Sequence, residues 1–204
     1  MDHERLPPLL EHQWSAKARA AIEPTIRSVA EMLGDPGLRT PARRKPLNIL
    51  LTLAHNDQLI GPFLQWAGAL AVTGALDRRD AELLALRASW NCRSDFEWGH
   101  HVEYALHAGL SRGEIDRIPL GPAAPGWTGN QQILLQAADE LHRAQCIADD
   151  TWVQLSAAFE PAQLVELVMT VGQYTMLSMV ANSFAVEVER GLDLLPPEPP
   201  GGAG

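Results

Sequence analysis

Residues 82–110, which read ELLALRASWNCRSDFEWGHHVEYALHAGL, combine acidic and histidine side chains at helical spacing with an otherwise apolar composition. Glu97 and His101 are four residues apart and therefore share one face of a helix. His100 borders the same face, and Glu82 lies far enough upstream to come from a neighbouring helix. A carboxylate and an imidazole held in an apolar wall are typical of proton-transfer chemistry. The segment therefore predicts an acid–base site.

The structural alternative for Glu97 and His101 is an exposed pair that contributes only a few tenths of a kcal/mol to helix stability. The large apolar residues Phe96, Trp98 and Val102 favour a buried helix instead. We expect His101 to face the pocket because of its four-residue spacing from Glu97. His100 takes that place if the helix is overwound or kinked at Gly99.

Metal and thiol chemistry are the alternatives to proton transfer in this segment. Glu97 and His100 form a Glu-x-x-His motif, but a di-iron bundle needs a second such motif, and the chain has none. It also lacks HExxH and zinc-like Cys/His spacing, so we predict no metal. Cys92 is interpreted as a buried structural thiol. Ser94 is either a helix N-cap or a pocket hydroxyl.

A second group of polar residues lies in the last long apolar segment. Tyr174, Ser178 and Asn182 are spaced four and four, next to Gln173. Because buried polar groups need partners, this stripe either joins helices or lines a cavity. His55 is a further candidate for the pocket, or else a cap at the end of its own short helix. The methionines at 169, 176 and 179 are interpreted as core residues.

The hydrophobic periodicity is helical throughout, which predicts an all-α fold with eight or nine helices. We expect a loosely ordered lead-in at 1–13, one helical domain at 14–192 and a Pro/Gly-rich disordered tail at 193–204. Within the domain, stop signals and capping patterns divide the chain. The predicted helices span 15–33, 46–55, 59–74, 79–91, 94–107, 111–118, 128–147, 149–159 and 161–190, with a loop at 119–127 and with Asp149 or Asp150 as a cap.

Composition limits the function classes. The formal net charge of −9 argues against a nucleic-acid partner, and the short basic cluster at 39–45 is interpreted as a solvated connector. No apolar run approaches the ~18 residues of a membrane span, and the N-terminus does not resemble a secretory signal. The two cysteines, Cys92 and Cys146, form no CxxC pair and suit a reducing compartment. We therefore predict a cytoplasmic protein without a membrane partner.

The segment from Glu82 through EWGHH to HAGLS resembles the carboxymuconolactone decarboxylase family, in the superfamily of alkylhydroperoxidase D. The stretches NILLTLAHNDQL, GALDRRDAELLALR and TVGQYTMLSMVANSF extend this resemblance over about residues 45–188. It implies an all-α fold, protomers that assemble as trimers or trimers of dimers, and a pocket beside the motif helix. Asn56–Asp57 departs from the pattern, which has Asn or His followed by Pro.

The resemblance also implies roles for individual residues. His101 and Glu82 occupy the positions of the histidine and glutamate of the peroxidase branch, whose two cysteine positions are Ser94 and Glu97 here. Without those cysteines a thiol peroxidase is not expected. Glu97 followed by Trp98 resembles the decarboxylase branch, in which a lactone carboxylate leaves as CO2 and the resulting carbanion is protonated without a cofactor.

We therefore expect a cofactor-free lyase for a small carboxylated or lactone metabolite. In this hypothesis His101 is the acid, Glu97 positions it, and Glu82 is a supporting carboxylate or proton relay. The remaining substrate-binding candidates are Ser94, Trp98, His100, His55, Tyr174 and Asn182, and a cationic anchor for a di-acid is sought in Arg87 or Arg93. The alternatives are a cofactor-free isomerase, cyclase or hydrolase for a larger natural product, a non-catalytic oligomeric binding protein and, remotely, a thiol peroxidase.

Overall fold

The computed structural model describes residues 5–32 and 47–198, and the described chain is all-helical, with nine α-helices and two short 3-10 helices. This confirms the predicted fold class. The predicted end of the first helix at residue 33 and the basic cluster at 39–45 lie outside the described residues. The chain divides into two compact units, Met1–Thr73 with Val180–Arg190 and Gly74–Met179 with Gly191–Gly204.

The first unit contains η1 (Glu11–Gln13), α1 (Ala16–Met32), α2 (Asn48–Leu53) and α3 (Ile60–Val72). Helices α1 and α3 pack against each other, and α1 continues through Pro24. The start of α2 is held by residues far along the chain, since the backbone N–H of Asn48 donates to Glu189 (2.7 Å) and its side chain donates to the carbonyl of Glu187 (2.9 Å).

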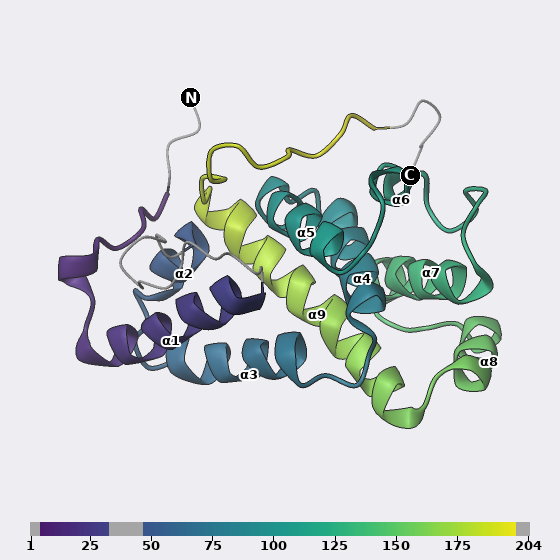
Figure 1. Cartoon of the computed structure of the whole chain (residues 1–204), viewed down its shortest axis with the longest axis horizontal. Helices are drawn as coiled ribbons and strands as arrows, with labels where there is room; N and C mark the ends of the chain where they lie inside the picture. Colours follow the sequence, from purple (N-terminus) through teal and green to yellow (C-terminus); the bar gives the residue numbers. More distant parts are fainter. Residues whose placement is uncertain (1–4, 33–46, 199–204) are drawn as a thin grey trace. The chain divides into compact units, whose positions relative to one another are not determined.

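The second unit contains α4 (Arg78–Asn91), α5 (Asp95–His107), α6 (Arg112–Ile115), η4 (Ile118–Leu120), α7 (Gly129–Ala144), α8 (Asp149–Ala158) and most of α9 (Pro161–Phe184). Helix α4 packs against both α5 and α7, as Figure 1 shows. Residues 81–90 of α4 are all buried, so this helix forms the centre of the unit's hydrophobic core.

Capping residues set the helix ends near the motif segment. The carboxylate of Asp77 accepts from the N–H of Arg79 (2.9 Å) at the start of α4, and the hydroxyl of Ser94 accepts from the N–H of Glu97 (3.4 Å) in α5. At the end of α5, Gly109 has φ +89°, a left-handed conformation that glycine adopts without steric cost. The predicted capping boxes at Ser111 and Thr128 are both present.

Several predicted boundaries were wrong. Helix α8 begins after Ala148, so Asp149 and Asp150 occupy its first turn instead of capping it. The predicted loop at 119–127 begins with part of η4, where Pro119 fits the start of a short helix. Helix α9 ends at Phe184, not near 190, and Ala185 follows it in a left-handed conformation.

Helix α9 is long and apolar enough to cross a membrane by length and composition alone, but 50 % of its most apolar window is buried within the protein. A core helix satisfies the same criterion. Leu164, Leu167 and Val171 belong to the core of the second unit, whereas Met169, Met176 and Met179 are exposed. The expectation that these methionines fill the core was wrong, because they lie on the opposite face of the helix.

Residues 193–198 lack helical structure but pack against the helices of the second unit, to which they belong. The N–H of Leu195 donates to the carboxylate of Asp95 (2.9 Å), and Leu195 packs against the core. Asp193 pairs with Arg112 at 2.5 Å. This part of the Pro/Gly-rich tail is therefore packed, although the sequence predicted that it would not be.

A buried ion pair joins α4 to α7. The Nε and Nη2 atoms of Arg87 donate to the two carboxylate oxygens of Asp139 at 2.6 and 2.8 Å, and Nη1 donates to the carbonyl of Ile118 (2.7 Å). The amide of Asn91 also donates to Asp139 (2.8 Å), and a Cβ at Gly121 would approach the guanidinium within 3.2 Å. Arg87 is therefore committed to holding α4, α7 and η4 together.

Replacing Asp139 by alanine should lower the free energy of unfolding by about 3–5 kcal/mol, because the guanidinium of Arg87 then stays buried without its counter-charge. The double variant Arg87→Met, Asp139→Leu should lose clearly less than the sum of the two single variants. Urea unfolding of the full chain measures both. A cost below about 1 kcal/mol for Asp139→Ala would show that the pair does not hold the helices.

Candidate active site

The site is built on α4 and α5, which are joined by a short connection at 92–94. Arg93 adopts a left-handed conformation there (φ 54°), and the N–H of Ser94 donates to the carbonyl of Ser89 (3.0 Å). This tight turn makes the two helices neighbours, as in an αα-hairpin. Glu82 on α4 and His101 on α5 consequently face each other.

Glu82 and His101 form the shortest contact of the site. The Oε2 atom of Glu82 lies 2.6 Å from Nδ1 of His101, and the two residues are only 1 % and 4 % exposed. An ionised carboxylate can only accept hydrogen bonds, so this contact requires the proton on Nδ1. Glu82 thus orients the imidazole and leaves Nε2 as the nitrogen available for proton transfer in the neutral ring.

Glu97 lies on the other side of the same imidazole. Its Oε2 atom is 3.7 Å from Nε2 of His101, and it is 4 % exposed. We expected Glu97 to position His101 and Glu82 to support it. The structure assigns the direct hydrogen bond to Glu82 and places Glu97 beside the nitrogen that Glu82 leaves available.

Arg78, one turn before Glu82 on α4, extends the site toward solvent. Its Nη2 atom lies 2.5 Å from Oε1 of Glu82, and its side chain is 31 % exposed. Glu82 therefore contacts Arg78 with one carboxylate oxygen and His101 with the other. The sequence analysis did not identify Arg78, although its four-residue spacing from Glu82 was the signal that could have revealed it.

Two tyrosines enclose the imidazole. The rings of Tyr174 on α9 and Tyr104 on α5 meet His101 edge-on, with centroids 4.2 and 5.3 Å away. Burial raises the pKa of Tyr174 well above its ordinary value, and the nearby carboxylates of Glu82 and Glu97 raise it further. The phenol thus remains a neutral hydrogen-bond donor at the site. Tyr104 is the second residue that the sequence analysis missed.

His100 faces a different environment from His101. It is buried between the rings of Phe96 and Tyr104, with centroids 4.7 and 6.3 Å from its own. His101 is therefore the histidine that meets the carboxylates.

The other predicted site residues are divided between packing and the first unit. Ser94 is the buried N-cap of α5, and Trp98 packs edge-on against Trp90 in the core at 6.1 Å. His55 and Asn182 belong to the first unit, where His55 Nε2 lies 3.0 Å from the carbonyl of Pro7.

Both predicted cationic anchors have partners within the protein. Arg87 is buried in the pair with Asp139. The guanidinium of Arg93 lies 4.5 Å above the ring of Trp90 and 3.7 Å from Glu198. The candidacy of Arg87 was wrong because an arginine's partners depend on which helices are adjacent, which short sequence spacing does not give, whereas Arg93 is partly exposed.

Cys92 is separate from the site. Its sulfur lies 3.8 Å from Nδ1 of His142, and it is partly buried. Burial raises the pKa of the Cys92 thiol, while the nearby hydroxyls of Thr175 and Ser178 partly oppose this. A thiol with a raised pKa is a poor source of the thiolate that peroxide chemistry needs. Within residues 5–32 and 47–198, no group of three His, Cys, Asp or Glu residues is arranged to hold a metal ion.

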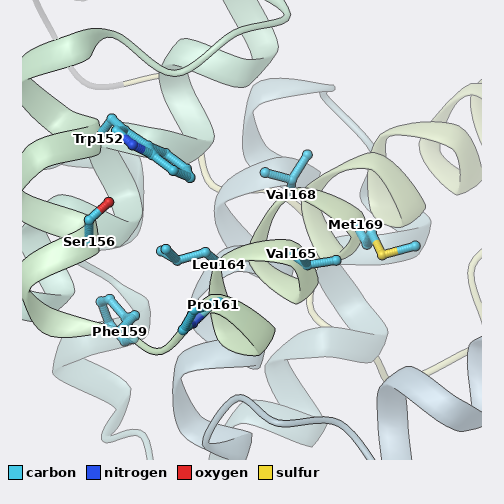
Figure 2. Close-up of a pocket in the computed structure, with 8 residues that line it drawn as sticks. All are labelled: Trp152, Ser156, Phe159, Pro161, Leu164, Val165, Val168 and Met169. Carbon is cyan, nitrogen blue, oxygen red and sulfur yellow. The ribbon is translucent and has the colours of Figure 1, made fainter.

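A groove of about 620 Å³ lies between α8 and the start of α9. Figure 2 shows Trp152 of α8 and Phe159, just after that helix, facing Leu164 and Val168 of α9. Ser156 is its one polar lining side chain, and none of the candidate catalytic residues lines it. The groove therefore offers apolar contact but no acid–base chemistry.

Comparison with known proteins supports the resemblance seen in the sequence. Residues 63–140 match the Carboxymuconolactone decarboxylase family, and this segment contains Glu82, Glu97 and His101. The search of curated proteins finds no match.

Solved structures share the fold. An uncharacterized peroxidase-related protein from Ralstonia eutropha JMP134 matches with a TM-score of 0.75 and 15 % identity, covering 93 % of this chain and 94 % of that one. The debrominase Bmp8 in complex with 2,3,4-tribromopyrrole matches with a TM-score of 0.73 and 13 % identity, over 93 % and 94 %. A protein of unknown function from Agrobacterium tumefaciens, with a suggested AhpD antioxidant role, matches with a TM-score of 0.62 and 21 % identity. The match covers 66 % of this chain and 93 % of that one.

Residues 63–140 thus carry the signature of the carboxymuconolactone decarboxylase family, on an all-helical fold of the alkylhydroperoxidase D type. This confirms the resemblance inferred from the sequence. Only two cysteines are present, and they do not form a CxxC pair.

Tyr174 should resist ionisation. In a Tyr104→Phe variant, Tyr174 is the only tyrosine, and we expect no phenolate absorbance up to about pH 10, where an exposed tyrosine is half ionised. An unfolded chain releases that proton first, so the free energy of unfolding should fall as the pH rises above about 10. Ultraviolet titration with parallel urea unfolding checks this. An ordinary titration in a folded protein would contradict it.

The two thiols should react very differently. Cys146 is exposed, whereas Cys92 is partly buried with a raised pKa, so a thiol reagent near neutral pH should label Cys146 at least about tenfold faster. The single variants Cys92→Ser and Cys146→Ser separate the two rates in a spectrophotometric assay. Peroxide-dependent loss of the Cys92 thiol at a comparable or faster rate would contradict this and revive a redox role.

Proposed function

We propose that this chain is a cofactor-independent lyase of the carboxymuconolactone decarboxylase type that acts on a small carboxylated or lactone metabolite. The observation that carries the proposal is the buried series of contacts from Glu82 through His101 to Glu97. Oε2 of Glu82 lies 2.6 Å from Nδ1 of His101, and Oε2 of Glu97 lies 3.7 Å from its Nε2. Such an arrangement gives one imidazole nitrogen a fixed proton and leaves the other beside a carboxylate, as general acid–base catalysis requires.

In the proposed reaction the bond between the substrate carbon and its carboxylate breaks, and CO2 leaves. The electron pair moves into the conjugated carbonyl system, giving an enolate-like intermediate. His101, as imidazolium, gives its Nε2 proton to the carbon, and Glu82 stabilises the imidazolium charge through Nδ1. Glu97 restores the proton to Nε2 from water. The apolar walls exclude water, and the phenol of Tyr174 donates a hydrogen bond to the developing oxyanion.

The proposal accounts for the burial of the site. Carboxylates and imidazole in a water-poor environment interact more strongly with charge that develops during a reaction than they would in solvent. The neutral phenol of Tyr174, 4.2 Å from the imidazole ring, is suited to donate a hydrogen bond without itself losing a proton.

A second candidate keeps the same proton-transfer residues without loss of CO2. It is an isomerase, cyclase or hydrolase for a larger natural-product intermediate. The complex of a cysteine-to-alanine variant of a debrominase with 2,3,4-tribromopyrrole supports it in one respect, because a protein of this fold binds a ligand that is neither a carboxylate nor a lactone. The resemblance further leads us to propose a homo-oligomer, trimeric or a trimer of dimers, with a small-molecule substrate. Charge, cysteine usage and hydropathy lead us to propose a cytoplasmic protein with neither a nucleic-acid nor a membrane partner.

The deciding assay is CO2 release from freshly generated carboxymuconolactone. We expect wild-type protein to release CO2 and His101→Ala to lose at least about 100-fold in kcat, since general acid–base catalysis contributes about 10²–10⁴-fold. We expect Glu97→Gln to lower kcat by a factor in the same range. Circular dichroism confirms that each variant is folded, and His107→Ala, on the exposed end of the same helix, is the matched control that should keep activity.

If folded wild-type protein releases no CO2, the proposed decarboxylase activity is wrong. Solvent deuterium incorporation into unsaturated lactones then tests the second candidate. Its loss in His101→Ala would support proton transfer without decarboxylation. Equal ligand binding by wild type and both site variants, with no turnover of any substrate, would instead indicate a non-catalytic binding protein.

A further inference from the structure

We propose that Arg78 is a positioning residue that fixes which nitrogen of His101 carries the proton. The inference rests on the proposed function for its catalytic consequence. Its structural content, the tautomer of His101, is measurable without any substrate.

The geometry places Arg78 at the start of a continuous series of contacts. Its Nη2 atom meets Oε1 of Glu82 at 2.5 Å, and Oε2 of the same carboxylate meets Nδ1 of His101 at 2.6 Å. A carboxylate held at one oxygen can still rotate about its terminal side-chain torsion, because many values of that torsion are similar in energy. Held at both oxygens by groups on two different helices, it has one orientation.

The charge of Arg78 acts in the same direction as its geometry. Glu82 is 1 % exposed, and a buried carboxylate needs partners at its oxygens. The guanidinium is a charge-assisted hydrogen-bond donor to one oxygen, and the imidazole meets the other.

A second observation links Arg78 to the site. The positive charge of Arg78 opposes the rise in the pKa of the Tyr174 phenol that burial and Glu82 cause. The guanidinium is therefore close enough to act electrostatically on the residue that covers the other face of His101. The side chain of Arg78 is also 31 % exposed, whereas Glu82 and His101 are buried.

The neighbouring arginine provides a matched control. Arg79 follows Arg78 in the same helical turn and has a side chain of similar exposure, 33 %. Its guanidinium pairs with Glu114 and with the carbonyl of Gly109, on the α5–α6 side and away from His101. Substitutions at Arg79 therefore remove the same charge from α4 without touching the carboxylate that orients the imidazole.

The test is long-range ¹H–¹⁵N NMR of histidine-labelled full-length protein, at a pH where the imidazole is neutral. The His101 signals are assigned from the His101→Ala variant among the seven histidines. We expect the Nδ1–H tautomer in wild type and in Arg79→Gln, and a mixture of both tautomers in Arg78→Gln. The opposite tautomer in wild type, or an unchanged Nδ1–H tautomer in folded Arg78→Gln, would overturn the proposal.

The conservative pair Arg78→Lys and Arg79→Lys keeps the test decisive if Arg78→Gln does not fold. A lysine keeps the charge but lacks the planar guanidinium, so it holds the carboxylate less firmly. We expect the Nδ1 proton of His101 to exchange with water about tenfold faster in Arg78→Lys than in Arg79→Lys. Equal exchange rates in these two folded variants would overturn the proposal.

Turnover separates this inference from the proposed reaction. With a substrate in hand, Arg78→Gln should lower kcat by about 10–100-fold, as loss of a residue that supports a reactive group typically does, with KM changed less than about threefold. Arg79→Gln should change neither. A wild-type protein without activity would count against the proposed reaction, while the NMR result would still decide the role of Arg78.

Discussion

Burial of the Glu82 carboxylate is the constraint on which the rest of the site depends. Glu82 is the second residue of a ten-residue stretch of α4, residues 81–90, that is buried throughout, so water cannot solvate it. A buried carboxylate persists only when hydrogen-bond donors or charges satisfy its oxygens. His101 from α5 and Arg78 from the preceding turn do so, one at each oxygen. The imidazole is thereby oriented by the same contact that makes the buried acid tolerable.

The connection between α4 and α5 makes this contact possible. The turn at Cys92, Arg93 and Ser94 reverses the chain within three residues, and the hydroxyl of Ser94 caps α5. A longer connection would let α5 slide along α4 and separate the carboxylate from the imidazole. On its other side α4 is held to α7 by Arg87 and Asp139, so the wall behind the site is rigid. The site is therefore a property of the packing of α4 and not of the motif alone.

The helical periodicity and the capping boxes at Ser111 and Thr128 predicted most elements correctly, because they depend on residues within one or two turns of each other. The same local rule placed Glu97 and His101 on one face. It did not show that Glu82 makes the shorter contact, since that depends on how α4 and α5 pack. Nor did it show that Arg87 would pair with Asp139 inside the protein. The left-handed turn at Arg93 has no glycine to signal it.

The side chains beside the imidazole decide which chemistry this fold supports. By the resemblance, Ser94 and Glu97 occupy the positions where the peroxidase branch has its two cysteines, so a cap and a carboxylate replace a redox pair. The remaining thiol near the site segment, Cys92, has a raised pKa and its nearest imidazole is that of His142, not His101. A shared fold with peroxidase-related proteins does not by itself assign their activity to this chain. What His101 has beside Nε2 is a carboxylate, which can exchange protons but cannot exchange electrons, and this is why proton transfer is the chemistry the site favours.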